Sequence, residues 1–149
     1  MFEPECSGEY ACLLKAVEYA ADAVVITDTH GRIQYINPAF TTLTGYSREE
    51  AVGQSTRLLK SGRHSAEFYE ELWSTILSGR VWQGDVTNRR KDGTLFDEEM
   101  RIAPVKDSKG VTTGYIAIKH DVSERRAHQQ ALRDSLEYPV SVVNAGFTY

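Results

Sequence analysis

Long hydrophobic runs are absent from this chain of 149 residues. No apolar stretch approaches the ~20 residues that a membrane-spanning helix needs. The N-terminus also lacks the basic start and apolar segment of a secretory signal. We therefore expect no membrane insertion in this segment and a cytoplasmic location.

Cysteines are scarce as well, and basic residues are outnumbered by acidic ones. The two cysteines, Cys6 and Cys12, both precede the predicted core and have no downstream partner, which predicts reduced thiols without a disulfide framework or a metal site. Lysines and arginines number 17 against 21 acidic residues, which gives a net charge of -4 and a pI near 5.6. A nucleic-acid surface needs a basic stripe, so nucleic acid is not an expected partner.

The composition is that of a soluble globular protein, with 41% hydrophobic and 26% charged residues. A chain of this length holds one domain plus flanking segments. Its strongest local signal is a hairpin across residues 81–105. Two runs with a period of two are joined there by a polar turn that carries Asp92 and Gly93, which predicts paired antiparallel strands.

Two polar residues of this hairpin fall on its apolar face. Asn88 shares a side of the first strand with Trp82, and Glu98 shares a side of the second with Met100. An inward polar group needs a partner, so one interpretation is a cavity with a ligand, a water or a buried ion partner. The other interpretation is that both residues lie near strand ends, where solvent reaches them. The sequence favours neither.

The remaining pattern predicts an α+β arrangement, an antiparallel sheet with helices on one face. Residues 53–62 are expected to be irregular, and 115–118 to form a central strand buried on both faces. Strands are predicted at 23–28, 33–37, 81–90, 94–105 and 115–118, and helices at 10–21, 38–43, 65–78 and 124–138.

Helix caps support these boundaries. Asn37 is predicted to cap the helix that Pro38 begins and Gly45 ends, and Ser47 with Glu50 has the spacing of a capping box. The last helix has Asp121 or Ser123 as its cap, with Glu124 at capping-box spacing from Asp121, and is expected to end at Pro139.

Two further features concern the end of the sheet. Lys119 lies on the same side of its strand as Tyr115 and Ala117. It is therefore expected to contact Glu98 if the strand at 115–118 pairs with the strand at 94–105. The last helix carries a weak coiled-coil seam, although an exposed helical spacer fits its polar surface as well. The seam consists of Val122, Arg125, Gln129, Leu132 and Leu136.

The order of these elements resembles that of the PAS family of sensory domains, and the likeness covers about residues 13–126. It predicts an N-terminal segment and the start of a flanking helix at 1–12, a five-stranded PAS domain at 13–121, a coiled-coil linker helix at 122–138, and a tail at 139–149 that begins a further domain. The stretches that carry it are 25–28 (VITD), 31–33 (GRI), 37–40 (NPAF), 44–46 (TGY), 49–53 (EEAVG), 89–94 (RRKDGT), 104–105 (PV) and 121–125 (DVSER).

This resemblance implies a sensory module of a bacterial signal-transduction protein, such as a two-component system. The module would bind a small ligand or cofactor and pass its state through Asp121, Ser123, Glu124 and the last helix to a kinase, cyclase or PAS domain downstream. The alternative is a ligand-free dimerisation or interaction module that uses the outer sheet face, with Ile116 and Ile118, and the flanking helices. In both cases a homodimer is expected.

An enzyme is not expected. The candidate pairs, Glu98 with Lys119 and His120 with Asp121, come without a nucleophile, a metal cage or a phosphate loop.

The resemblance also bears on a cofactor. Residues 53–59 are similar to the flavin-binding motif of light-oxygen-voltage domains, with Arg57 inside it and Thr56 where their photochemistry needs a cysteine. Asn88 resembles a flavin-contacting asparagine, whereas Glu98 and Lys119 stand where that branch has amides.

Trp82 and the stretch 88–92 also resemble redox-sensing PAS domains that hold FAD without a covalent bond, so FAD is the leading candidate. Phe40, Leu58 and Met100 are predicted to form the apolar wall of the cavity. Haem is not expected, because haem-binding relatives use a histidine from the helix at 65–78. None lies in it here, and His64 just before it is expected at the surface.

Overall fold

The computed structural model describes residues 8–142, whose elements follow the predicted order. The bounds are α1 (Glu9–Glu18), β1 (Ala23–Thr27), β2 (Ile33–Ile36), α2 (Pro38–Thr44), α3 (Arg48–Ala51), the 3-10 helix η2 (Thr56–Leu59), α4 (Ala66–Leu77), β3 (Trp82–Arg89), β4 (Leu95–Lys106), β5 (Thr112–Asp121) and α5 (Ser123–Val142).

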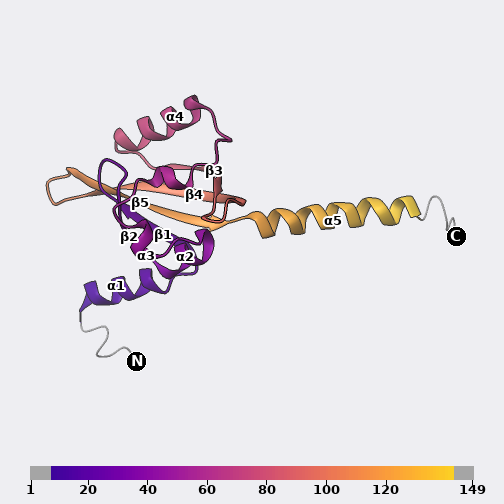
Figure 1. The fold of residues 1–149 in the computed structure, drawn as a ribbon, viewed down its shortest axis with the longest axis horizontal. Helices are drawn as coiled ribbons and strands as arrows, with labels where there is room; N and C mark the ends of the chain where they lie inside the picture. The colour runs from indigo at the N-terminus through magenta and orange to yellow at the C-terminus, as the bar shows by residue number, and fades with distance from the viewer. Residues whose placement is uncertain (1–7, 143–149) are drawn as a thin grey trace.

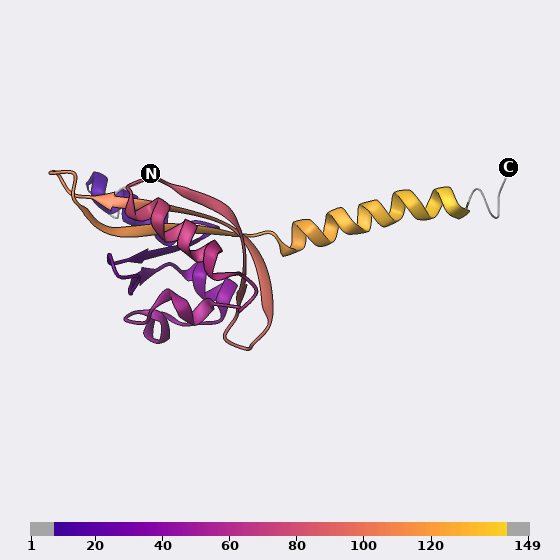
Figure 2. The ribbon, with the colours of Figure 1, turned by 90° about the horizontal axis from the view of Figure 1, so that it is seen from above.

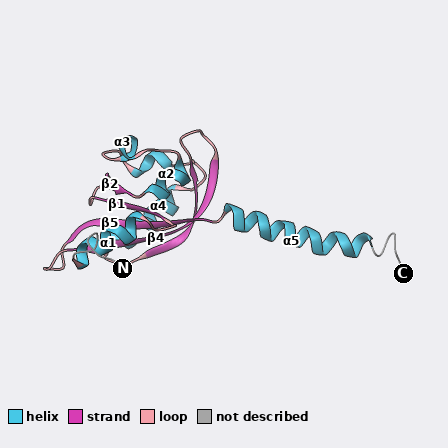
Figure 3. Ribbon diagram, turned by 90° about the horizontal axis from the view of Figure 1, so that it is seen from below, coloured by secondary structure: helices cyan, strands magenta, loops and turns pink. Residues whose placement is uncertain are grey.

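The five strands form one antiparallel sheet in the order β2-β1-β5-β4-β3, so β5 is the central strand as predicted. The sheet lies between α4 and α1 in the view of Figure 1, and Figure 3 shows the strands curling around the short helices. The predicted fold class is therefore confirmed.

Two hydrophobic clusters pack on the inner face of the sheet. The first joins β1 and β2 to α2, α3 and η2, and the second joins α4 to β3, β4 and β5. Division of the core into two parts leaves room between them, because the short helices and the longer α4 cover different halves of the sheet. The first cluster includes Val25, Ile36, Phe40 and Leu59, and the second includes Leu72, Ile76, Trp82, Met100 and Tyr115.

The Asn37 side chain, at the N-terminus of α2, makes hydrogen bonds that connect three elements. Its Oδ1 accepts hydrogen bonds from the N–H groups of Val24 at 2.9 Å and Phe40 at 3.2 Å. Its Nδ2 donates to the carbonyl oxygens of Val17 and Asp22, each at 3.0 Å. The predicted N-cap is thus confirmed, and this one buried amide also ties α1 and β1 to the helix it caps.

The end of α1 is held by a second, partly buried contact. Tyr35 Oη donates to Glu18 Oε1 at 2.5 Å. Burial, followed by this hydrogen bond to a carboxylate, raises the pKa of Tyr35 to about 12.

Four local predictions were wrong. Helix α1 ends at Glu18, three residues before its expected end. Residues 56–59 within the expected irregular stretch form η2, because Ser55 Oγ accepts the Arg57 N–H and starts a turn. Helix α5 continues past Pro139 to Val142, although an interior proline removes one intrahelical hydrogen bond and disfavours the helix, so the proline is not an absolute stop here. The remainder of the predicted tail, 143–149, lies outside the described residues, as does Cys6.

The fourth concerns β5, which was expected to be buried on both faces. Ile118 is 42% exposed and Ile116 only partly buried, because the short helices and α4 cover just the inner face of the sheet. On α1, Leu13 and Leu14 are also more than half exposed. This side of the domain therefore presents unusual apolar surface.

Helix α5 leaves the domain directly after β5 and projects away from the other elements in both views of Figures 1 and 2. Its root is fixed, since the Val122 N–H donates to Asp97 O at 3.0 Å and the Val122 side chain is fully buried. Farther along, Leu132 and Leu136 are exposed. No helix within residues 8–142 is both long and apolar enough to span a membrane.

We expect Asn37→Ala to lower the free energy of unfolding by about 3 kcal/mol, because it removes a helix cap and leaves buried backbone groups unpaired. Urea denaturation measures the change. The matched control is Ser47→Ala, which removes the less buried cap of α3 and should cost about 1 kcal/mol. Equal losses in the two variants would contradict the role of Asn37 as a tie between elements.

Candidate functional site

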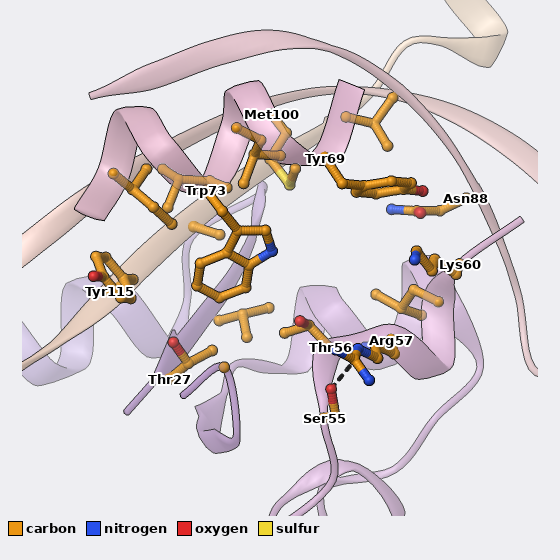
Figure 4. A pocket seen from close by; sticks show the side chains of 18 of the residues that line it. Thr27, Ser55, Thr56, Arg57, Lys60, Tyr69, Trp73, Asn88, Met100 and Tyr115 are labelled. Carbon is orange, nitrogen blue, oxygen red and sulfur yellow. Dashed lines mark hydrogen bonds between the residues drawn. The ribbon is translucent and has the colours of Figure 1, made fainter. Parts of the chain in front are cut away.

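A cavity of about 470 Å³ lies between the two hydrophobic clusters. Its volume is in the range of small-molecule sites in proteins. Figure 4 shows α4 directing Tyr69 and Trp73 into it, opposite η2. Its apolar walls come from both clusters and are formed by Val25, Leu59, Leu72, Trp73, Ile76, Val86, Met100, Ile102, Tyr115 and Ala117.

Three polar side chains from neighbouring strands meet at one end of the cavity, and we call them the polar triad. Glu98 Oε2 accepts from Asn88 Nδ2 at 2.7 Å and from Lys119 Nζ at 2.8 Å. All three side chains are buried, and Glu98 is fully enclosed. The strand-end interpretation is therefore wrong, and the expected meeting of Lys119 with Glu98 is confirmed.

The register of the sheet explains this meeting. Met100 of β4 pairs with Lys119 of β5, and Glu98 pairs with Asp121, so Glu98 and Lys119 are diagonal neighbours. Both point inward because side chains alternate along each strand. A buried charge without a partner is strongly unfavourable, so each ion requires the other.

Two buried polar atoms near this end have no hydrogen-bond partner among the described residues, Glu98 Oε1 and Tyr69 Oη. Tyr69 and Asn88 both line the cavity (Figure 4), and both adjoin Lys60, which forms a β-bridge with Asn88 and places its Nζ 4.2 Å from the centre of the Tyr69 ring. Burial raises the pKa of Tyr69, so the phenol stays a neutral donor. Buried polar groups are normally satisfied, and the cavity is where a partner would be found.

The rim of the cavity is basic. Arg57 and Lys60 come from η2 and its end, Arg32 and His30 from the β1–β2 turn, and Lys60 Nζ lies 4.2 Å from the centre of the Tyr69 ring. Within residues 8–142 no aspartate or glutamate lines the cavity. A positive lining is notable in a chain with a net charge of -4, because it concentrates anions locally.

Five of the nine predicted site residues line the cavity: Thr56, Arg57, Asn88, Met100 and Lys119. The other four do not. Glu98 lies behind Asn88 and Lys119. Trp82 packs edge-on against Phe68 in the second cluster, with the two ring centroids 5.7 Å apart. Phe40 is fully buried under α2, and Leu58 packs against the first cluster while its neighbour Leu59 faces the cavity.

The aromatic wall and part of the rim were not among the predicted site residues. Tyr69 and Trp73 are four residues apart on α4, a spacing that places them on one face of a helix and could have revealed them. Lys60 and Tyr115 were also missed as lining residues.

His64 and His120 make contacts outside the cavity. His64 is half-buried, accepts the Thr87 N–H at 2.9 Å through Nε2 and stacks on Phe68, so its expected surface position was wrong. His120 pairs with Asp22 at 2.8 Å, and no contact with Asp121 joins them into an acid/base pair within the described chain. Residues 8–142 contain no group of three or more potential metal ligands.

The predicted relay residues stand at the root of α5. Asp121 Oδ1 accepts the Ser123 N–H at 2.9 Å, and its Oδ2 lies 3.7 Å from Arg90 Nη2. Ser123 Oγ accepts the Asp97 N–H at 3.1 Å. These contacts connect the helix to β4 beside Glu98; the Glu124 side chain lies outside the described part of the structure.

Comparison with known proteins shows which proteins the whole domain resembles. Residues 21–124 match a family described as PAS domain. A nitrogen fixation regulatory protein of Klebsiella oxytoca is 37% identical over 128 residues, covering 86% of this chain and 26% of that protein. A blue-light-activated histidine kinase of Brucella canis is 28% identical over 149 residues, covering 89% and 30%.

Among solved structures, a light-oxygen-voltage domain studied with a flavin analogue has a TM-score of 0.69 and 29% identity, covering 85% of this chain and 96% of that one. This chain thus spans less than a third of either relative named above but nearly all of the solved domain.

Removal of the Lys119 charge from the polar triad should reveal the free-energy cost of burying Glu98 without a counter-charge. We expect Lys119→Met to destabilise the domain by about 3–5 kcal/mol, because Glu98 then stays buried without a counter-charge. Adding Glu98→Gln to Lys119→Met should restore most of that loss. Urea denaturation of both variants tests this, and a single variant as stable as the parent would contradict the pairing.

Proposed function

The chain belongs to the PAS domain family, and we propose that it is a sensory module that binds a small ligand or cofactor in its inner cavity. The domain is of the type found in signalling proteins such as histidine kinases and regulators. The observation that carries the proposal is the cavity itself, which combines apolar walls, a buried polar triad and a basic rim.

FAD is the cofactor we propose. The donor set fits a flavin, because Asn88 and Lys119 offer N–H groups to a ring with carbonyl oxygens, and Trp73 and Tyr69 offer aromatic surface to a flat ring. Arg57 and Lys60 at the rim would hold its phosphates. A bound flavin would supply one- or two-electron redox chemistry and visible absorption.

Thr56 limits which flavin chemistry this module can perform. It lines the cavity at the position where light-oxygen-voltage relatives need a cysteine. A hydroxyl with a pKa far above that of a thiol does not replace it, so an adduct-forming photocycle is not part of the proposal. Redox state or ligand occupancy is the signal we propose.

We propose that the output leaves through α5. Lys119 lines the cavity two residues before Asp121, and Asp121 and Ser123 anchor the root of the helix. A change at Lys119 therefore has a short covalent path to α5, with Glu124 in its first turn. A kinase, cyclase or further PAS domain is the proposed receiver.

The absorption spectrum of the purified protein tests the flavin proposal. We expect flavin bands, and we expect Ala117→Phe to abolish them, because Ala117 lines the cavity and a larger ring would fill it. Ile116→Phe is the matched control on the outer face of the same strand and should keep the bands. A spectrum without flavin bands after reconstitution with FAD would refute FAD as the cofactor. A Soret band would identify haem as the cofactor instead.

The exposed apolar surface favours a second function, a homodimer formed through the outer sheet face and the flanking helices. Ile118 and the exposed α1 leucines, Leu13 and Leu14, provide apolar contacts for a second copy.

We expect Ile118→Lys to convert a dimer to a monomer in light scattering, because a buried lysine at such an interface would be unpaired. Val111→Lys, on the loop between β4 and β5, is the control and should leave the mass unchanged. A dimer that survives Ile118→Lys would contradict use of the outer face.

A further inference from the structure

We propose that the part of the cavity lined by Asn88 and Lys119 recognises an anionic or electron-rich acceptor group of the ligand, and that Lys119 is the residue that selects it. The inference deepens the proposed function, since it assigns a ligand chemistry to the same cavity.

The first argument is the hydrogen-bonding capacity of Lys119. An ammonium carries three N–H donors. Within the described residues, Lys119 Nζ donates to Glu98 Oε2 at 2.8 Å and to Met100 Sδ at 3.3 Å. The third N–H has no such partner although the side chain is 95% buried, with 5% of its surface exposed, and lines the cavity. A buried donor of this kind requires an acceptor.

The second argument is that other donors gather beside it. Asn88 Nδ2 and Lys119 Nζ donate to the same carboxylate oxygen, so the two nitrogens lie close together. The Tyr69 hydroxyl has no partner within the described residues, and its ring lines the same cavity 4.2 Å from Lys60 Nζ, where Lys60 forms a β-bridge with Asn88. An acceptor group with two or more oxygens can therefore accept from Lys119 and Asn88 together, with Tyr69 as a further donor in the same cavity.

The third argument is the orientation of charge. Lys119 lines the cavity, whereas its counter-ion Glu98 lies behind it and does not. The ion pair thus acts as a fixed dipole whose positive end faces the ligand. Because the dielectric constant of the protein interior is low, the Lys119 charge acts strongly on a ligand in the cavity. No acidic residue among the described lining residues offsets it.

Carboxylates, phosphates and the carbonyl edge of an isoalloxazine ring share the required acceptor chemistry. Amines and other cations do not, and the cavity should reject them. Amide residues in place of Glu98 and Lys119 would offer hydrogen bonds without the charge, so the ion pair changes selectivity while leaving the size of the cavity nearly the same.

Fluorescence quenching of Trp73 tests the charge without knowledge of the ligand. Trp73 lines the cavity, and Trp82→Phe removes the other of the two tryptophans. We expect iodide to quench Trp73 more strongly than caesium does. Glu98→Gln with Lys119→Gln, which leaves the net charge unchanged, should cut iodide quenching at least twofold while neutral acrylamide quenches as before. Lys109→Gln, on an exposed loop, is the control and should change neither.

Equal iodide quenching with and without the ion pair would overturn the inference. If the glutamine pair does not fold, Glu98→Leu with Lys119→Met is the second variant, judged by the same ratio of iodide to caesium quenching.

Titration of the unsubstituted protein with riboflavin, succinate and putrescine separates this inference from the proposed function. We expect riboflavin or succinate to bind, with at least tenfold weaker binding in the glutamine pair, and putrescine not to bind. Binding of putrescine alone would overturn the inference while leaving a ligand-binding function. Failure of all three probes would contradict the proposed function, and the quenching ratio would still decide the inference.

Discussion

The ion pair between Lys119 and Glu98 constrains both the sheet and the cavity. Because side chains alternate, a slip of one residue between β4 and β5 would turn one ion outward and leave the other buried alone. The pair thus penalises wrong registers more than it adds to net stability, since buried ion pairs often contribute little compared with apolar contacts. The same register sets which side chains line the cavity, so pairing of strands and recognition of a ligand depend on one contact.

The core explains why a cavity exists beside that pair. Short helices α2, α3 and η2 pack over β1 and β2, and α4 packs over the curved β3–β4 hairpin. Neither group reaches across the whole inner face. The resulting gap is lined by aromatic rings from α4 and by basic residues from η2, so its two sides differ in chemistry.

The sequence predicted the features that depend on local chemistry. The caps at Asn37 and Ser47, the hairpin turn and the inward direction of Glu98 follow from side-chain hydrogen bonding and from alternation along a strand. The positions of Trp82 and Leu58 could not be predicted in the same way, because alternation tells which face a residue occupies but not whether that part of the face lines a cavity or is filled by a neighbouring ring. Tyr69 and Lys60 reach the cavity only through the placement of α4 and η2, which is a tertiary property.

The direct passage from β5 into α5 makes the strand and the helix parts of one lever. Val122 alone separates them, and its buried side chain with the bond to Asp97 forms the pivot. A helix of 20 residues is ~30 Å long. With a rigid helix of that length, a rotation of ~5° at the pivot moves the far end by ~2.5 Å, about half a helical turn in pitch. A displacement too small to alter the sheet would thus suffice to change how two such helices meet.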